Sequence, residues 1–244
     1  MEAHVGCSGW FYWHWRGIFY PDTKRTDGWF KHYAANFNTV ELNAPFYSWP
    51  KTATVRAWVR NAPEHFRYSI KVNREITHER RLVRTRKLVA EFCDMEKTLG
   101  PKLGCFLFQF PPSYKYTPSR LRSIVTQIDA PFRCAIEFRH RSWWREAVYS
   151  AFAKHGLIFC TISAPRLPDG LIRTAGTIYL RLHGRSRWYR HDYTDSELEE
   201  WARKIARSGA REAWIYFDND REGFAIKNAR ELIKRLGDLK VKVT

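Results

Sequence analysis

Short apolar runs rich in β-branched and aromatic residues recur along the chain and alternate with segments of helical period. Continuous apolar runs of this length are typical of strands that are buried on both faces, as in a parallel sheet. Eight such runs lie at residues 4–10, 37–47, 66–72, 103–112, 132–138, 157–163, 177–184 and 212–220. Apolar residues with a period near 3.6 predict helices over residues 27–37, 52–62, 81–100, 118–128, 143–156, 194–209 and 221–237.

This alternation of strands and helices predicts the fold. Strands that alternate with helices pair in parallel through right-handed crossovers. Eight strands in 244 residues predict one α/β domain over residues 1–244, folded as a (β/α)8 TIM-type barrel. A doubly wound open sheet is the alternative. Residues 164–176, "APRLPDGLIRTAG", read as a loop, so we expect the sixth helix to be short or missing.

Composition narrows the class of protein. Hydrophobic residues make up 44% of the chain, which excludes a disordered protein. A net charge of +17 favours a polyanionic partner, although a solvated basic surface would give the same value. The five cysteines include no CxxC pair, which argues for a reducing compartment and against an iron–sulfur cluster or zinc ribbon. With no signal peptide and no membrane-length apolar run, we expect a cytoplasmic protein that does not bind membranes.

Polar side chains follow most of the predicted strands. Ligands of a parallel barrel bind at the carboxyl ends of its strands. Glu137 and Arg139 are two residues apart, as are Arg181 and His183, so each pair shares one face of a strand. Because isolated buried charges are costly, this set must pair with itself or face a ligand, and we expect a binding site. Its members are Glu41, Asn43, Lys71, Asn73, Gln109, Glu137, Arg139, Arg181, His183, Asp218 and Asn219.

These residue types suggest roles. Arg139 and Arg181 could hold a phosphate or carboxylate, with Lys71 as a further positive charge and Trp143 or Trp144 closing the rim. The carboxylates could also bind a divalent metal with His183, but the cations compete for them, so we expect no metal or other cofactor. The expected catalytic residues are Glu41 or Glu137 to activate water, His183 to donate a proton, and Asp218.

Two segments are typical of nucleic-acid contacts. Residues 67–87 contain eight basic and two acidic residues, which could follow a phosphate backbone. The loop after His183 interleaves arginines with aromatic residues that could stack on bases. Both segments could equally be solvated or packed surface. The residues that we assign to nucleic acid are Arg80, Arg81, Arg84, Arg185, Arg187 and Trp188.

Seven stretches occur together in a fixed order: "GCSGWFYWHWRGIFYP", "FNTVELNAPFYSWP", "SIKVNREITHERRL", "KLGCFLFQFPPSY", "AIEFRHRSWW", "YLRLHGR" and "YFDNDREGFAIKNA". Over essentially the whole chain they resemble the YecE-like family, also called the domain-of-unknown-function 72 family. The resemblance implies a TIM-type barrel but no established activity, substrate or cofactor. The family tends to carry aspartate where this chain has Ser163 and asparagine where it has Asp218, so the identity of the catalytic base stays open.

The sequence therefore favours an enzyme that hydrolyses a phosphoester in a phosphorylated small molecule or in nucleic acid. Arg139, Arg181 and Lys71 would bind the anion and stabilise developing charge. One alternative is a protein that binds nucleic acid or an anionic ligand without catalysis. Another is a sugar-phosphate isomerase that uses a lysine or glutamate base at the same rim. The fold itself is compatible with all three.

Overall fold

A closed barrel of eight parallel strands forms the centre of the computed structural model, which describes residues 1–129 and 131–244. Strand β1 pairs with β2 on one side and with β8 on the other, so the sheet has no open edge between them. This closure confirms the (β/α)8 barrel and excludes the open sheet. The strands are β1 (Glu2–Ser8), β2 (Thr39–Leu42), β3 (Arg67–Lys71), β4 (Leu103–Gln109), β5 (Cys134–Glu137), β6 (Ile158–Ser163), β7 (Thr177–Leu182) and β8 (Glu212–Phe217).

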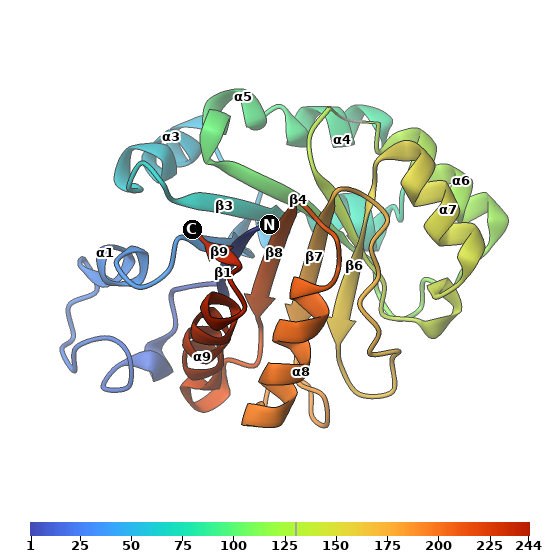
Figure 1. Ribbon diagram of the computed structural model, residues 1–244. Coiled ribbons are helices and arrows are strands. Elements are labelled where there is room, and N and C mark those ends of the chain that lie inside the picture. The colour runs from blue at the N-terminus through green and yellow to red at the C-terminus, as the bar shows by residue number, and fades with distance from the viewer. Residues whose placement is uncertain (130) are drawn as a thin grey trace.

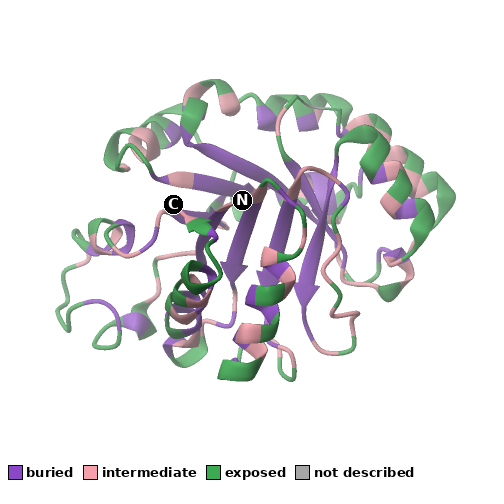
Figure 2. Ribbon diagram, in the orientation of Figure 1, coloured by how far each residue is buried: buried purple, intermediate pink, exposed green. Residues whose placement is uncertain are grey.

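Helices surround the barrel, and their outer faces are exposed while the strands are buried (Figures 1 and 2). A short strand, β9 (Lys242–Val243), pairs with the start of β1, so the two termini lie side by side. No helix of the described chain is both long and apolar enough to cross a membrane. The helices are α1 (Trp29–Ala34), α2 (Ala44–Tyr47), α3 (Thr52–Asn61), α4 (Arg86–Cys93), α5 (Glu96–Leu99), α6 (Pro118–Gln127), α7 (Glu146–His155), α8 (Asp195–Ala206) and α9 (Phe224–Asp238).

The connection between β6 and β7 contains no helix across residues 164–176, all of which the structure describes. Side-chain hydroxyls supply the hydrogen bonds that hold this loop against the barrel. Thr174 Oγ1 donates to the carbonyl of Leu157 at 2.7 Å and accepts from the amide of Phe159 at 2.9 Å. Thr161 Oγ1 accepts from the amide of Ile172 at 2.9 Å. The predicted absence of a sixth helix is therefore confirmed.

The prediction of a single helix over residues 81–100 is wrong. A π-helical turn at Glu75–Glu79 is followed by irregular backbone, and α4 begins only at Arg86. Arg81, Leu82 and Arg84 have φ angles of +48°, +56° and +53°, which a right-handed helix does not allow. Leu82 contributed to the helical spacing of apolar residues in this segment. It is fully buried, as that spacing predicted, but it anchors a loop and does not belong to a helix.

Alternate side chains of each strand point into the barrel and fill it in layers. On β8 and just after it, the alternate residues Trp214, Tyr216 and Asp218 point to the same side of the strand. On β7, Tyr179 and Arg181 do the same. Gly104 leaves room for the Trp214 ring, since a Cβ there would lie 2.5 Å from it. The Tyr216 hydroxyl next contacts the hydroxyls of Thr39 and Ser69, each at 2.8 Å. Above this layer, the barrel interior becomes charged.

Candidate functional site

The guanidinium of Arg181 lies at the centre of a buried charge network at the carboxyl end of the barrel. It is 1% exposed and contacts carboxylates on three other strands or strand ends. Its partners are Glu41 at 2.6 Å, Glu137 at 2.6 Å and Asp218 at 3.1 Å, together with Ser8 Oγ at 2.9 Å and His183 Nε2 at 3.2 Å. A guanidinium has five N–H groups, so these acceptors occupy all of them.

The carboxylates of Glu41 and Glu137 are fully buried and belong to this network. Glu41 also accepts hydrogen bonds from Ser8 Oγ at 2.6 Å and from the Tyr179 hydroxyl at 2.7 Å. Burial alone would raise the pKa of Glu137, but Arg139 and Arg181 outweigh it and hold that pKa well below its usual range. Neither carboxylate lines the cavity described below. Their predicted role in activating water is therefore not supported, and they serve to hold Arg181.

His183 is also fully buried, and each of its ring nitrogens lies close to a charged side chain. Nε2 lies 3.2 Å from a nitrogen of Arg139 and 3.2 Å from one of Arg181, while Nδ1 lies 2.8 Å from Oδ2 of Asp218. Guanidinium groups only donate, so Nε2 must accept. His183 therefore orients the two arginines, and the geometry does not support its predicted role as proton donor to a substrate.

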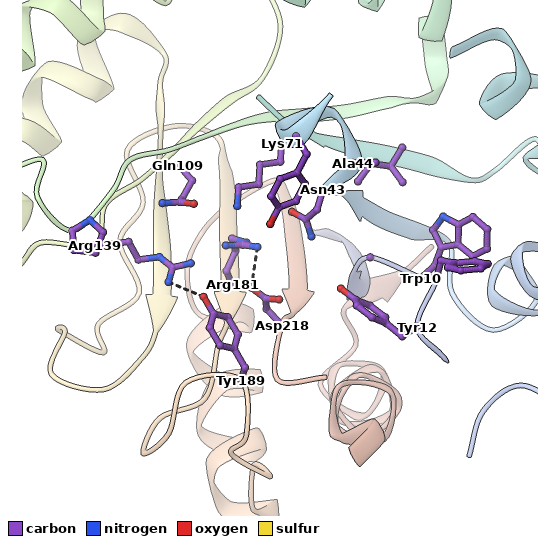
Figure 3. A pocket seen from close by; sticks show the side chains of 15 residues that line it. Trp10, Tyr12, Asn43, Ala44, Lys71, Gln109, Arg139, Arg181, Tyr189 and Asp218 are labelled. Atoms are coloured by element: carbon purple, nitrogen blue, oxygen red, sulfur yellow. Dashed lines mark hydrogen bonds and ion pairs between the residues drawn. The ribbon is translucent and has the colours of Figure 1, made fainter. Parts of the chain in front are cut away.

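A cavity of about 730 Å³ lies beside this network at the carboxyl ends of the strands (Figure 3). Both polar and aromatic side chains line the cavity. Asn43 donates to Ser8 Oγ at 2.9 Å, and its Oδ1 has no partner among the residues that the structure describes. The polar residues Asn43, Lys71, Gln109, Arg139, Arg181 and Asp218 meet here, as the strand-end argument predicted.

Most of the aromatic residues of this pocket were not identified from the sequence, apart from Tyr189 in the arginine–aromatic loop after His183. Trp10, Phe11 and Tyr12 come from the loop after β1, Tyr47 from α2, and Tyr189 from the loop after β7. Three of these side chains are well exposed: Phe11 at 46%, Tyr47 at 71% and Tyr189 at 41%. The signal was their position at or after the ends of the predicted strands, where a large apolar side chain that no core requires is available to a ligand.

Lys71 places an amine in this cavity from the end of β3 (Figure 3). Its Nζ lies 4.2 Å from the ring centroid of Phe46. Within the described chain, the amine makes no hydrogen bond or ion pair. Burial, reinforced by the nearby Arg181, lowers the pKa of Lys71 to about 8. A minor fraction of this amine is therefore uncharged at pH 7, and about half of it is uncharged at pH 8.

Arg139 is the arginine that can still bind a ligand. Its Nε pairs with Glu137, Nη1 donates to the Tyr189 hydroxyl at 3.2 Å, and Nη2 lies 3.2 Å from His183 Nε2. Three of five N–H groups are thus used, and two remain. Its guanidinium also lies 4.5 Å from the ring centroid of Trp188. The predicted base-stacking residue Trp188 thus packs on an arginine of the pocket.

Three residues predicted to bind substrate have structural roles instead. Trp143 is fully buried, stacks on Phe138 with ring centroids 3.9 Å apart, and donates from its indole to the Tyr114 carbonyl, so it does not close the rim. Asn73 donates to the Pro45 carbonyl at 2.9 Å. Asn219 donates to the His191 carbonyl at 2.7 Å and to Asn228 Oδ1 at 2.7 Å. These amides fix the loops around the pocket.

The arginines assigned to nucleic acid fall into two groups. Arg80 is paired with Glu75 at 2.8 Å, and Arg185 is paired with Asp169 at 2.6 Å and Glu200 at 2.9 Å. These two charges are largely neutralised within the protein. Across residues 1–129 and 131–244, no ion pair involves the other three, which are Arg81, Arg84 and Arg187. Nucleic-acid binding stays a prediction.

Removal of divalent metal should leave the melting temperature unchanged. The carboxylates beside the pocket are already neutralised by Arg139 and Arg181, so the fold does not need a cation there. Thermal denaturation with and without EDTA measures this. A decrease of more than about 5 °C, which corresponds to a substantial part of the stability of a domain, would contradict it.

Comparisons with known proteins agree with the fold. The model of the family described as "Protein of unknown function DUF72" matches residues 4–243. UPF0759 protein YunF of Bacillus subtilis (strain 168) is 27% identical, over 96% of this chain and 94% of its own length. UPF0759 protein YecE of Escherichia coli (strain K12) is 28% identical over 52% of this chain and 47% of its own length.

Two crystal structures of DUF72 family proteins have the same fold. The protein from Thermotoga maritima MSB8 superimposes with a TM-score of 0.88 and 26% identity, covering 97% of this chain and all of that one (100%). The protein from Enterococcus faecalis V583 has a TM-score of 0.83 and 20% identity, covering 96% of this chain and 95% of that one. Because the family model matches residues 4–243, the chain belongs to the DUF72 family of proteins of unknown function.

Proposed function

We propose that the chain is an enzyme that moves a proton next to the carbonyl group of a small substrate, as an isomerase does, with Lys71 as the base. The observation that supports this is the amine of Lys71, which lies in the cavity without a polar partner in the described chain and has a pKa of about 8. A general base works best when its pKa lies near the working pH. Of the charged groups of the pocket, Lys71 meets this condition.

Arg139 would stabilise the product of that proton transfer. Removing a proton next to a carbonyl puts negative charge on the carbonyl oxygen. Fixed hydrogen-bond donors aimed at that oxygen lower the activation free energy of the proton transfer. The two open N–H groups of Arg139 are such donors. Lys71 and Arg139 point into the same cavity from the ends of β3 and β5 (Figure 3).

The charge balance of the site favours a substrate with little charge. Three carboxylates and three cations meet at this end of the barrel, so the local sum is close to zero although the whole chain is basic. The aromatic residues of the cavity and the amides of Asn43 and Gln109 suit a polyhydroxylated carbonyl compound such as a sugar.

Phosphoester hydrolysis is less well supported than proton transfer. Hydrolysis requires a base that can reach a water molecule, and Glu41 and Glu137 are buried and fully paired. Asp218 does line the cavity. Burial would raise the pKa of Asp218, but Arg181 outweighs it and lowers that pKa, which makes the carboxylate a weak base.

The test is deuterium exchange. The protein in D₂O, given aldoses, ketoses, 2-keto acids and their phosphate esters in turn, should place deuterium next to the carbonyl of one class, detected by NMR. The rate should rise with pH up to about 8 and then level off, because the protonated form of Lys71 cannot accept a proton. Hydrolysis of p-nitrophenyl phosphate without exchange into any carbonyl compound would overturn the proposal.

A further inference from the structure

A second cavity, of about 400 Å³, lies between the loop that follows β3 and the start of α6. Its lining residues differ from those of the pocket that contains Lys71. Both segments follow carboxyl ends of strands, since the loop comes after β3 and α6 after β4. The second cavity therefore opens at the same end of the barrel as the first. Arg81, Tyr114, Ser119 and Arg120 line it.

The hydroxyl of Tyr114 is a buried polar group without a partner. Tyr114 is 1% exposed, and within the described residues no group forms a hydrogen bond with its hydroxyl. Buried hydroxyls are nearly always paired, because an unpaired one costs free energy. Burial raises the pKa of Tyr114 to about 12 against the opposing effect of Arg120 and Arg81, so the hydroxyl keeps its proton and can donate it. A ligand in the cavity that accepts a hydrogen bond would complete the site.

Two guanidinium groups line the cavity together with Tyr114 and have no carboxylate to balance them. The guanidinium of Arg120 lies 4.7 Å from the centroid of the Tyr114 ring and donates to the Lys115 carbonyl at 2.7 Å. Arg81 donates to the His78 carbonyl at 3.2 Å. In the part of the chain that the structure describes, neither of them makes a salt bridge. Both keep N–H groups that are free to bind an anion.

The acidic residue of the cavity does not cancel these charges. Glu79 lines the cavity but is paired with Arg74 at 2.9 Å. Arg80, which also lines the cavity, is paired with Glu75 at 2.8 Å. Each of these two ion pairs has a net charge of zero. The charges of Arg81 and Arg120 are therefore the net charge that a ligand would meet.

The loop that carries Arg81 is fixed against α6. Leu82 is fully buried and its carbonyl accepts a hydrogen bond from Ser123 Oγ at 2.7 Å. The side-chain amide of Gln127 donates to the same carbonyl. Both donors belong to α6, so the backbone that carries Arg81 is held next to the helix that carries Arg120. A preorganised backbone lowers the entropy cost of bringing the two side chains to one ligand.

We propose that this cavity binds a phosphoryl group, held by the guanidinium groups of Arg81 and Arg120 and by the hydroxyl of Tyr114. Guanidinium groups bind tetrahedral oxyanions through paired, charge-assisted hydrogen bonds, and a phenol hydroxyl adds a neutral donor. The phosphoryl group belongs either to a small phosphorylated compound or to the backbone of a single-stranded nucleic acid. The site is independent of Lys71 and of the reaction in the first pocket.

Titration calorimetry with inorganic phosphate at low ionic strength tests this. The double variant Arg81→Ala/Arg120→Ala should bind phosphate at least about tenfold more weakly than the natural protein. The matched control is Arg86→Ala/Arg122→Ala, which removes the same charge from the start of α4 and from α6 but not from the lining of the cavity. It should change binding less than about twofold. An equal loss in both double variants would mean a general charge effect and would overturn the proposal.

Tyr114→Phe provides a second, independent measurement. It removes one hydroxyl that has no protein partner in the described chain, so the melting temperature should not fall, while phosphate affinity should fall about fivefold. Unchanged phosphate affinity in this variant would remove Tyr114 from the site. Unchanged affinity in both Tyr114→Phe and Arg81→Ala/Arg120→Ala would overturn the site as a whole.

Titration with a labelled oligothymidylate distinguishes the two sources of the phosphoryl group. If oligonucleotide affinity falls in Arg81→Ala/Arg120→Ala and free phosphate competes, the ligand is a nucleic-acid backbone. If the variants weaken inorganic phosphate but leave the oligonucleotide unaffected, the ligand is a small phosphorylated compound. Absence of measurable binding of either probe at low ionic strength would overturn the proposal.

Discussion

Replacing Arg181 with methionine should lower the free energy of unfolding by about 3–5 kcal/mol, because one buried cation holds the charges of its neighbours together. The substitution leaves Glu41 and Glu137 buried with one cation fewer and removes a partner of Asp218. Denaturation by urea measures the change. Arg122→Met, at an exposed position of α6, is the control and should stay within about 0.5 kcal/mol of the natural protein.

The pH dependence of stability checks the cause of this loss. The pKa values of Glu137 and Asp218 are lowered in the folded protein by their arginine partners, which outweigh burial. A lowered folded pKa contributes stability that is present above the unfolded value of about 4 and is lost as the pH falls towards the folded value. Arg181→Met should be less sensitive to acid over this range. A loss below about 1 kcal/mol with unchanged acid sensitivity would contradict the central role of Arg181.

Replacing Lys71 with methionine should reduce deuterium exchange into the substrate by about 100- to 10,000-fold, the usual contribution of a general base. Stability should be retained or rise, because the amine has no polar partner in the described chain and its neighbour is the Phe46 ring. Lys71→Arg should be equally inactive, since a guanidinium does not lose its proton in proteins. Lys51→Met, at an exposed position before α3, is the control and should be fully active. Exchange at the normal rate in Lys71→Met would contradict the proposed base.

Most of the barrel could be predicted because the strands of a parallel barrel are buried on both faces. Each of the eight runs contains the core of one strand, and the ends differ by a few residues. The helix predicted over residues 81–100 failed for a physical reason. Leu82 needs burial whether it lies on a helix or anchors a loop, and spacing alone does not separate the two.

The members of the candidate site could be predicted, but their partners could not. Strand parity places Arg181 and His183 on one face, yet it does not tell whether a cation meets a carboxylate or a ligand. The partners of Arg181 come from β2, β5 and the end of β8, which only the closed barrel brings together. In the same way, the short 3-10 turn at Arg141–Trp143 decides that Trp143 enters the core. Lys71 stands out only because its three-dimensional surroundings contain no partner.

The helix-free connection between β6 and β7 makes the protein suitable for site-selective labelling. Its residues 164–176 run along the outside of the barrel, and the exposed Gly170 has no atom within 4 Å of where a Cβ would be. All five cysteines of the chain are buried. A cysteine introduced at Gly170 would therefore react with a maleimide dye far faster than the natural thiols. The dye would be attached where no helix has to be disturbed, which gives the protein one label at a defined position.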